Sequence, residues 1–255
     1  MKFLYICSFL TSLMLACHQQ KTLYDISIYD NTDVEKLALY VANEDTLNIH
    51  RLIAENKGLN IDSPDPILGK SLLMWSIFNG KYNSFAALLK QKANPNFVSK
   101  KDGKTPLIMS VNYVNNDYMP DDRFLKDLLS YGANPQLITC DSVNHVYVNP
   151  IYEASIHLQY IKDLIEICGV DPNYSLDGVS IVEVAVIQEK LDVLHYLVVE
   201  KNAKIDGVTK TFGKYKRPLI DFVKDWKYPI GSKEYKMKND ILKSYNRQIR
   251  KSNVK

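Results

Sequence analysis

The feature that most constrains this fold is a five-residue phrase that recurs along the chain at nearly equal spacing. The third residue of each copy is Asn, Asp or Lys, and these residues are separated by 34, 40, 37 and 33 positions. A period of about 20–50 residues is the signature of a stack in which one supersecondary unit is repeated. The copies lie at 58–62, 92–96, 132–136, 169–173 and 202–206.

A second phrase, which has the form of a helix start, recurs in the same phase. It is clearest in Asp102–Val111, where Thr105 can cap a helix with its side-chain oxygen and Pro106 takes the first helical position. Proline is tolerated there because no backbone donor is lost. The copies begin at Ser71, Thr105, Asn149, Ser180 and Arg217, with separations of 34, 44, 31 and 37 residues. Two phrases in one phase indicate a single repeated unit.

Two short amphipathic segments lie between the phrases of each repeat. In the clearest repeat we expect helices over 72–79 and 82–91, joined by a turn at Gly80 and Lys81. The second helix places its apolar residues at helical spacing, which predicts that they are buried: Phe85, Leu88 and Leu89. Neither helix is long enough to be stable alone, so each repeat must cover its apolar face by stacking on a neighbour.

The phrases resemble the ankyrin repeat, with Gly103–Leu107 and Leu128–Pro135 as the best matches. The resemblance covers residues 33–230 and implies an all-α, ankyrin-repeat solenoid of stacked helix-turn-helix units with finger loops. The histidine that often follows Thr-Pro-Leu in this family is Ile108 here. This difference implies that neighbouring repeats pack through more purely apolar contacts.

The repeats can be assigned along the chain as a domain of about five to six units, of which the first and last are degenerate. An N-terminal cap covers 33–62. Within this cap we expect two groups of apolar residues to pack against each other, Val34, Leu37, Ala38 and Val41 against Leu47, Ile49, Leu52 and Ile53. Full repeats follow at 63–96, 97–136, 137–173 and 174–206, and a partial one begins near 207. Residues 231–255 are expected to form a basic capping helix, from Ser232 to Lys251, and a tail.

Residues 1–16 have the form of a signal peptide, with Lys2 before an apolar run that is short for a membrane span. The end of this run resembles a bacterial lipobox, with small Ala16 before Cys17, although Met14 and Leu15 depart from the usual pattern. The resemblance implies lipid on Cys17, a tether over 17–32, and a place in the cell envelope that faces the periplasm, on the outer rather than the inner membrane. An ordinary signal peptide and an uncleaved anchor are the alternatives.

The sequence lacks the HExxH, GxSxG, Walker and GxGxxG patterns, so it predicts no enzyme, no catalytic residue, no cofactor and no metal site. An acidic loop with Asp117, Asp121 and Asp122 lacks the spacing of an EF-hand, and we expect it to be solvated or to face a partner. Two cysteines of the mature chain, Cys140 and Cys168, are not a disulfide framework. We expect free thiols that are buried or half-buried, and a bridge between them remains open.

Charge is unevenly distributed. Residues 201–255 hold 16 Lys and Arg against 5 Asp and Glu, a net charge of +11, whereas residues 1–200 hold 16 against 24, a net charge of −8. Four interpretations of the basic end remain open: a solvated cap, contact with anionic lipid, contact with an acidic protein, and nucleic-acid binding. Export argues against the last, so we expect no nucleic-acid partner.

Extra length lies in two loops, after Val111 and between Gln136 and Asn149. Insertions in repeat proteins map to loops on one face, which is often the binding face. We therefore expect a non-catalytic, monomeric module that binds a protein partner, with aromatic side chains as hot spots. The candidate contact residues are Lys101, Lys104, Tyr113, Tyr118, Tyr147 and His157. The resemblance to exported ankyrin-like lipoproteins implies an immunity protein that neutralises a toxin, and a helper that supports another periplasmic enzyme is the alternative.

If Cys17 carries the lipid, Cys17→Ala will abolish both lipid labelling and membrane retention, because no other residue can be acylated at that site. The measurement is metabolic labelling with a radioactive fatty acid, followed by fractionation of the cells. A variant that is labelled and retained like the wild type would contradict the anchor.

Overall fold

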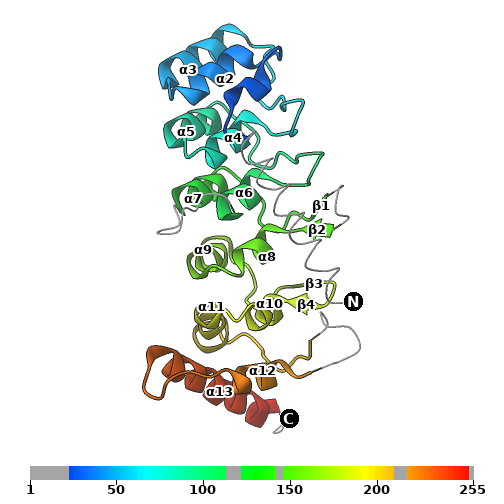
Figure 1. Ribbon diagram of the computed structural model, residues 1–255, viewed down its shortest axis with the longest axis vertical. Coiled ribbons are helices and arrows are strands. Elements are labelled where there is room, and N and C mark those ends of the chain that lie inside the picture. The colour runs from blue at the N-terminus through cyan, green and yellow to red at the C-terminus, as the bar shows by residue number, and fades with distance from the viewer. Residues whose placement is uncertain (1–22, 113–121, 142–145, 210–216, 253–255) are drawn as a thin grey trace, which may run out of the picture. The chain divides into compact units, whose positions relative to one another are not determined.

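The computed structural model describes residues 23–112, 122–141, 146–209 and 217–252 (Figure 1). Contacts divide the chain into two compact units, Met1–Val148 and Asn149–Lys255, which we call the N-terminal and C-terminal units. The division falls inside the repeat assigned to residues 137–173. Each unit is mostly helical, and its strands are short.

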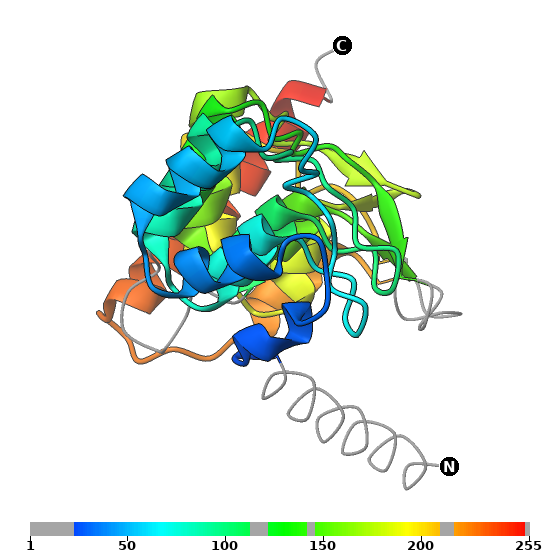
Figure 2. The same cartoon turned by 90° about the horizontal axis from the view of Figure 1, so that it is seen from above.

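The N-terminal unit contains three helix pairs, and contacts join each pair to the next. Finger loops, which end in the β1–β2 hairpin, lie on one side of these helices (Figure 2). The hairpin is antiparallel and pairs Thr139 with Val148. The elements are η1 (Ile26–Tyr29), α2 (Glu35–Ala42), α3 (Thr46–Glu55), α4 (Leu72–Phe78), α5 (Tyr82–Lys90), α6 (Pro106–Asn112), α7 (Asp122–Ser130), β1 (Thr139–Asp141) and β2 (Val146–Val148).

The C-terminal unit continues the same plan, and the long helix α13 packs against α11, η2 and α12 (Figure 1). The antiparallel hairpin β3–β4 turns at Asp177 and Gly178, which both have positive φ. The elements are α8 (Pro150–Ala154), α9 (Leu158–Cys168), β3 (Ser175–Leu176), β4 (Val179–Ser180), α10 (Ile181–Ile187), α11 (Leu191–His195), η2 (a π-helix, Tyr196–Glu200), α12 (Leu219–Asp225) and α13 (Lys233–Ser252).

The expected helix starts are confirmed at four of the five copies. The Ser71 hydroxyl accepts a hydrogen bond from the amide of Met74, and the Thr105 hydroxyl accepts one from Ile108. The side chains of Asn149 and Ser180 cap α8 and α10 in the same way. The fifth copy differs, because α12 begins at Leu219 and no side chain caps it. The N-cap residue there is Pro218, whose side chain has no hydrogen-bond acceptor.

The recurring phrase forms hydrogen bonds that tie one repeat to the next. Within a phrase, the side-chain oxygen of Asn94 accepts from the amide of Asn96, two residues further on. Between phrases, a side-chain oxygen of one accepts from a backbone amide of the next: Asp62 from Asn94 (2.9 Å), Asn96 from Asn134 (2.7 Å) and Asn173 from Lys204 (2.8 Å). Because only Asn and Asp place an oxygen at this reach, the spacing of the phrase sets the register of the stack.

The core lies between successive helices. Phe85, Leu88 and Leu89 are buried as expected, and the Phe85 ring packs against Phe124 of the next pair with centroids 4.9 Å apart. Leu107 lies in a run of buried residues in α6 that extends from Pro106 to Val111. Ile108, which stands where ankyrin repeats often have histidine, is fully buried.

Some expectations about the edges of the fold were wrong. Leu47 is 67% exposed rather than packed against α2, since it lies in the first turn of α3 on the solvent side. Cys140 and Cys168 are free, as expected, but both are exposed. Ile28 and Tyr29 are buried, so the folded part includes residues that we had assigned to the tether.

Within the described residues, no helix is long and apolar enough to cross a membrane. The same residues contain no cluster of His, Cys, Asp and Glu side chains that could hold a metal ion. The expected acidic loop lies outside the described residues except for Asp122, which pairs with Lys126 at 2.6 Å.

Leu107→Asp should destabilise the protein by at least about 3 kcal/mol, because it places an unpaired charge between two helix pairs. Leu47→Asp is the matched control and should change stability by no more than about 0.5 kcal/mol, because the side chain is exposed. Urea denaturation followed by circular dichroism measures both. Similar midpoints for the two variants would contradict the shared core.

Candidate protein-binding surface

Two successive fingers of the N-terminal unit have the same turn geometry. In the first, the amide of Asp65 donates to the carbonyl of Lys70 at 2.9 Å, and in the second, the amide of Ser99 donates to the carbonyl of Lys104 at 2.9 Å. Each turn closes at a glycine with positive φ, Gly69 or Gly103. The fingers are therefore ordered by their own backbone hydrogen bonds.

The first finger is further fixed by the buried carboxylate of Asp65. It accepts hydrogen bonds from the backbone amides of Ile67 (2.8 Å), Leu68 (2.5 Å) and Lys70 (2.7 Å). The buried hydroxyl of Tyr29 donates to the Lys70 carbonyl at 3.0 Å, which ties η1 to this finger. Burial, together with the nearby Asp65 charge, raises the pKa of Tyr29, so this hydroxyl stays a donor.

A buried ion pair joins the first finger to the second. The Lys70 side chain is only 6% exposed and that of Asp102 is 28% exposed, and the Lys70 ammonium group lies 2.5 and 2.6 Å from the two carboxylate oxygens of Asp102. Burial lowers the pKa of Lys70, and the Asp102 charge opposes that shift. Such a pair contributes little net stability, but losing one partner leaves a buried charge uncompensated. Its effect is to hold the two fingers in one arrangement.

The second finger contacts the β1–β2 hairpin so closely at Gly103 that no side chain would fit between them. A Cβ atom on Gly103 would lie 2.5 Å from the Cys140 carbonyl oxygen. The Thr139 hydroxyl donates to the Gly103 carbonyl at 2.5 Å. Glycine is required here both for its positive φ and for this close approach. The three fingers of the N-terminal unit thus form one connected structure.

Several large apolar side chains of these fingers are exposed to solvent. Alternate residues of a strand face opposite sides, and in the hairpin Thr139 and Val148 are buried while their neighbours Cys140 and Tyr147 are exposed. Tyr147 is 70% exposed. Among the exposed residues of the three fingers, which also include Pro64, Pro66 and Lys100, we call six the finger surface: Ile67, Val98, Lys101, Ile138, Cys140 and Tyr147.

The six predicted contact residues do not all lie on the finger surface. Tyr147 and Lys101 are on the finger surface, but the Lys101 ammonium group donates to the carbonyls of Pro66 (2.9 Å) and Ile67, so it bridges two fingers. Lys104 is half-buried at the base of the second finger. Tyr113 and Tyr118 lie outside the described residues.

His157 belongs to the C-terminal unit, whereas the finger surface belongs to the N-terminal unit. It precedes α9 without capping it, and its ring packs edge-on against Tyr160 with centroids 5.5 Å apart. Burial lowers the pKa of His157, as does the nearby Lys190 charge, while the Asp192 charge opposes the shift. The half-buried imidazole ring contributes packing against Tyr160 in this position.

Sequence reasoning missed the apolar members of the finger surface. Ile67, Val98 and Ile138 each lie close to a recurring phrase, at positions where a loop would be expected to be polar. Apolar residues at positions expected to be polar were the sequence signal that could have identified this surface. Cys140 could not be recognised, because its exposure depends on the pairing register of the hairpin.

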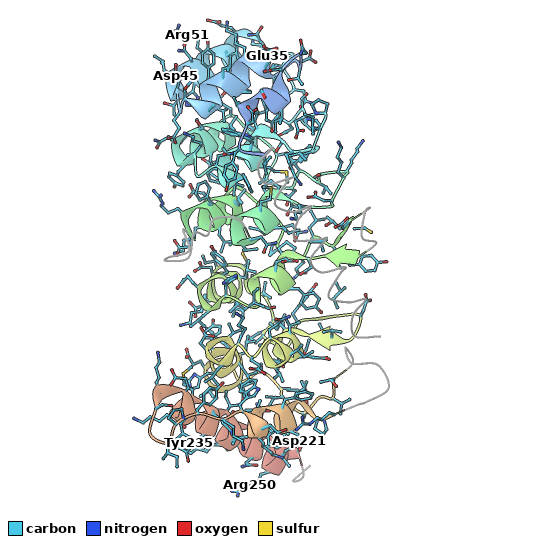
Figure 3. All side chains as sticks on the ribbon, viewed as in Figure 1. Glu35, Asp45, Arg51, Asp221, Tyr235 and Arg250 are labelled. Atoms are coloured by element: carbon cyan, nitrogen blue, oxygen red, sulfur yellow. The ribbon has the colours of Figure 1, made fainter. Side chains whose placement is uncertain are left out.

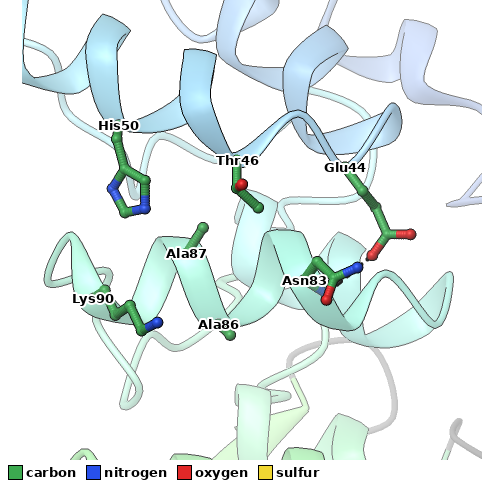
Figure 4. Close-up of a pocket in the computed structure, with 7 residues that line it drawn as sticks. All are labelled: Glu44, Thr46, His50, Asn83, Ala86, Ala87 and Lys90. Carbon is green, nitrogen blue, oxygen red and sulfur yellow. Dashed lines mark hydrogen bonds between the residues drawn. The ribbon is translucent and has the colours of Figure 1, made fainter.

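A hollow of about 290 Å³ lies between α3 and α5, away from the fingers (Figure 4). Polar groups line its ends, where the amide of Asn83 donates to the Glu44 carboxylate at 2.9 Å, and Ala86 and Ala87 form part of its wall. The His50 ring nitrogen is 2.7 Å from the Gln91 side-chain amide. The Glu44 carboxylate and the His50 ring are thus each engaged in a hydrogen bond.

A second hollow, of about 360 Å³, lies beside α12 in the C-terminal unit. The Arg217 guanidinium group lies over the Phe222 ring, 4.4 Å from its centroid, and pairs with the Asp225 carboxylate. The Arg217 charge lowers the pKa of Asp225 through a direct hydrogen bond. Arg217 and Asp225 are therefore matched to each other, and Glu189 and Lys227 also line the hollow.

Comparisons with solved structures show that the chain has the ankyrin-repeat fold. The human ASB11 ankyrin repeat domain matches with a TM-score of 0.53 and 20% identity, over 79% of this chain and 81% of that one. A chain of the Bdellovibrio bacteriovorus complex between the predatory endopeptidase Bd0816 and the immunity protein Bd3460 matches with a TM-score of 0.55 and 16% identity. That match covers 82% of this chain and 95% of the other. No family model and no curated protein matches the sequence.

Gly103→Ala should disturb the fingers more than Gly80→Ala does. Both glycines have positive φ, so both changes carry a strain of about 1–2 kcal/mol. Only Gly103 also has a backbone carbonyl in the way, which should add at least about 1 kcal/mol. Denaturation curves for the two variants measure the difference. Equal losses of stability would show that the second finger does not pack against the hairpin as described.

Proposed function

We propose that this chain is a non-catalytic module that binds a protein partner through the finger surface. The observation that carries the proposal is a set of exposed apolar side chains on loops that are rigidly held. Ile67, Ile138 and Tyr147 are 53%, 44% and 70% exposed, yet the turns beneath them are fixed by hydrogen bonds, the Lys70–Asp102 pair and the Gly103 contact. Rigid apolar and aromatic groups bind with a small loss of conformational entropy.

We further propose that the module is tethered to the bacterial cell envelope by lipid on Cys17 and faces the periplasm. Support comes from the apolar run that ends at Ala16 and Cys17, which lie outside the described residues. Leu23, the first described residue, is buried, so only a short segment would separate the lipid from the described part of the chain.

Within this proposal, an immunity protein that neutralises a partner toxin is the preferred role. One similar solved structure is described as an endopeptidase in complex with an immunity protein, which is compatible with that role. A helper that supports another periplasmic enzyme would use the same surface. The two roles differ in what binding does to the partner's activity.

Replacing both Ile67 and Tyr147 by Ala should weaken capture of the partner at least about 100-fold, since exposed anchors of this kind contribute about 2 kcal/mol or more each. Stability should hardly change, because both side chains are exposed. The matched control is Leu39→Ala with Tyr131→Ala, whose side chains are 49% and 46% exposed but lie off the fingers.

The measurement is quantitative capture from envelope extracts by wild type, finger variant and control, with the partner identified by mass spectrometry. A partner retained equally by the wild type and the finger variant would place the binding face elsewhere. The captured enzyme is then assayed with and without this protein. Inhibition would support the immunity role, whereas undiminished or raised activity would support the helper role.

A further inference from the structure

The exposed side of α13 carries a stripe of basic residues that the proposed binding function does not use. At about 100° per residue, six exposed Lys and Arg side chains fall within an arc of about 100° on this helix. We call them the basic stripe: Lys233, Lys236, Lys243, Arg247, Arg250 and Lys251. Figure 3 shows α13 at the end of the C-terminal unit, with Arg250 on its outer side.

The stripe remains positively charged after its internal contacts are counted. The acidic residue in the same arc, Asp240, pairs with Lys243 at 3.2 Å. Among the residues that the structure describes, no acidic side chain pairs with the other five members. Lys238 is not part of the stripe, because its ammonium group donates to the carbonyls of Lys224 and Trp226 at 2.7 Å.

The packed side of α13 explains why the stripe faces outward. Ile241 is fully buried against the unit. The Ser244 hydroxyl donates to the Val198 carbonyl, and the Gln248 amide donates to the Ala203 carbonyl. These contacts fix the rotation of the helix, so the basic residues stay on one side. From Lys233 to Lys251 the stripe is about 27 Å long, at 1.5 Å per residue.

We propose that the basic stripe lies against the anionic headgroups of a lipid bilayer. A bilayer with anionic lipid attracts such a segment by charge alone and needs no complementary shape. Protein interfaces instead depend on a desolvated apolar or aromatic centre and are depleted in lysine. No large exposed apolar side chain of the described chain lies on α13, and four of the six stripe residues are lysines. Ile230, which is 88% exposed in the loop just before the helix, could enter the interface beside the stripe.

The test is lysine acetylation of the full chain on vesicles of two compositions, with rates read for each peptide by mass spectrometry. One set contains phosphatidylcholine alone, and the other contains about 30% phosphatidylglycerol. Lipid on Cys17, as proposed above, would attach the chain to both sets, so only the charge of the bilayer would differ. Lys36 and Lys57, exposed residues of the N-terminal unit, are the internal controls.

On the anionic vesicles, the four stripe lysines should be acetylated several-fold more slowly than on the neutral ones, while Lys36 and Lys57 react at unchanged rates. The difference should vanish at about 1 M salt, where the Debye length is about 3 Å. Arg247→Gln with Arg250→Gln should weaken the attraction about 25-fold, at about five-fold for each charge, and largely remove the protection.

The matched control for that variant is Arg51→Gln with Lys57→Gln, which removes two exposed charges from the N-terminal unit and should leave the protection intact. Equal acetylation rates of the stripe on both kinds of vesicle would overturn the proposal. Protection by soluble poly-glutamate without protection by anionic vesicles would also overturn it, in favour of an acidic protein partner.

Discussion

Each helix pair of this chain presents an apolar face that only a neighbouring pair can cover. The helices of the N-terminal unit are seven to ten residues long, which is too short for stability in isolation. Burial of Phe85 against Phe124 and of the run from Leu107 therefore stabilises two pairs at once. This stacking fixes the positions of the loops between helix pairs, and therefore the position of any surface that these loops form.

Stacking alone would leave the loops free to move, and polar contacts remove that freedom. The Asp62–Asn94 hydrogen bond and the Lys70–Asp102 pair both join one repeat to the next. A buried pair of this kind is better explained by the single arrangement that it selects than by the stability that it adds. The proposed binding residues consequently sit on loops that behave as extensions of the core.

The fold could be predicted well from the sequence because its signals are local. Caps such as Ser71 and Thr105 depend on residues three positions away, and the recurring phrase depends on Asn and Asp within two. The candidate site was harder to predict. Lys101 was predicted as a contact residue, and no local pattern shows that its ammonium group also bonds carbonyls of the preceding finger, 34 and 35 positions earlier. The exposure of Cys140 depends on its pairing with Tyr147, and no local pattern specifies that register.

The central claim is that a protein partner covers the finger surface, and two native thiols allow it to be tested directly. Cys140 is exposed on that surface, whereas Cys168 is exposed at the end of α9 in the C-terminal unit. Alkylation of the two cysteines can be followed separately by mass spectrometry, in the free protein and in its complex. We expect the bound partner to slow the reaction of Cys140 at least about ten-fold, by burial of the thiol, and to leave that of Cys168 unchanged. An unchanged rate at Cys140, or protection of Cys168 instead, would contradict the account.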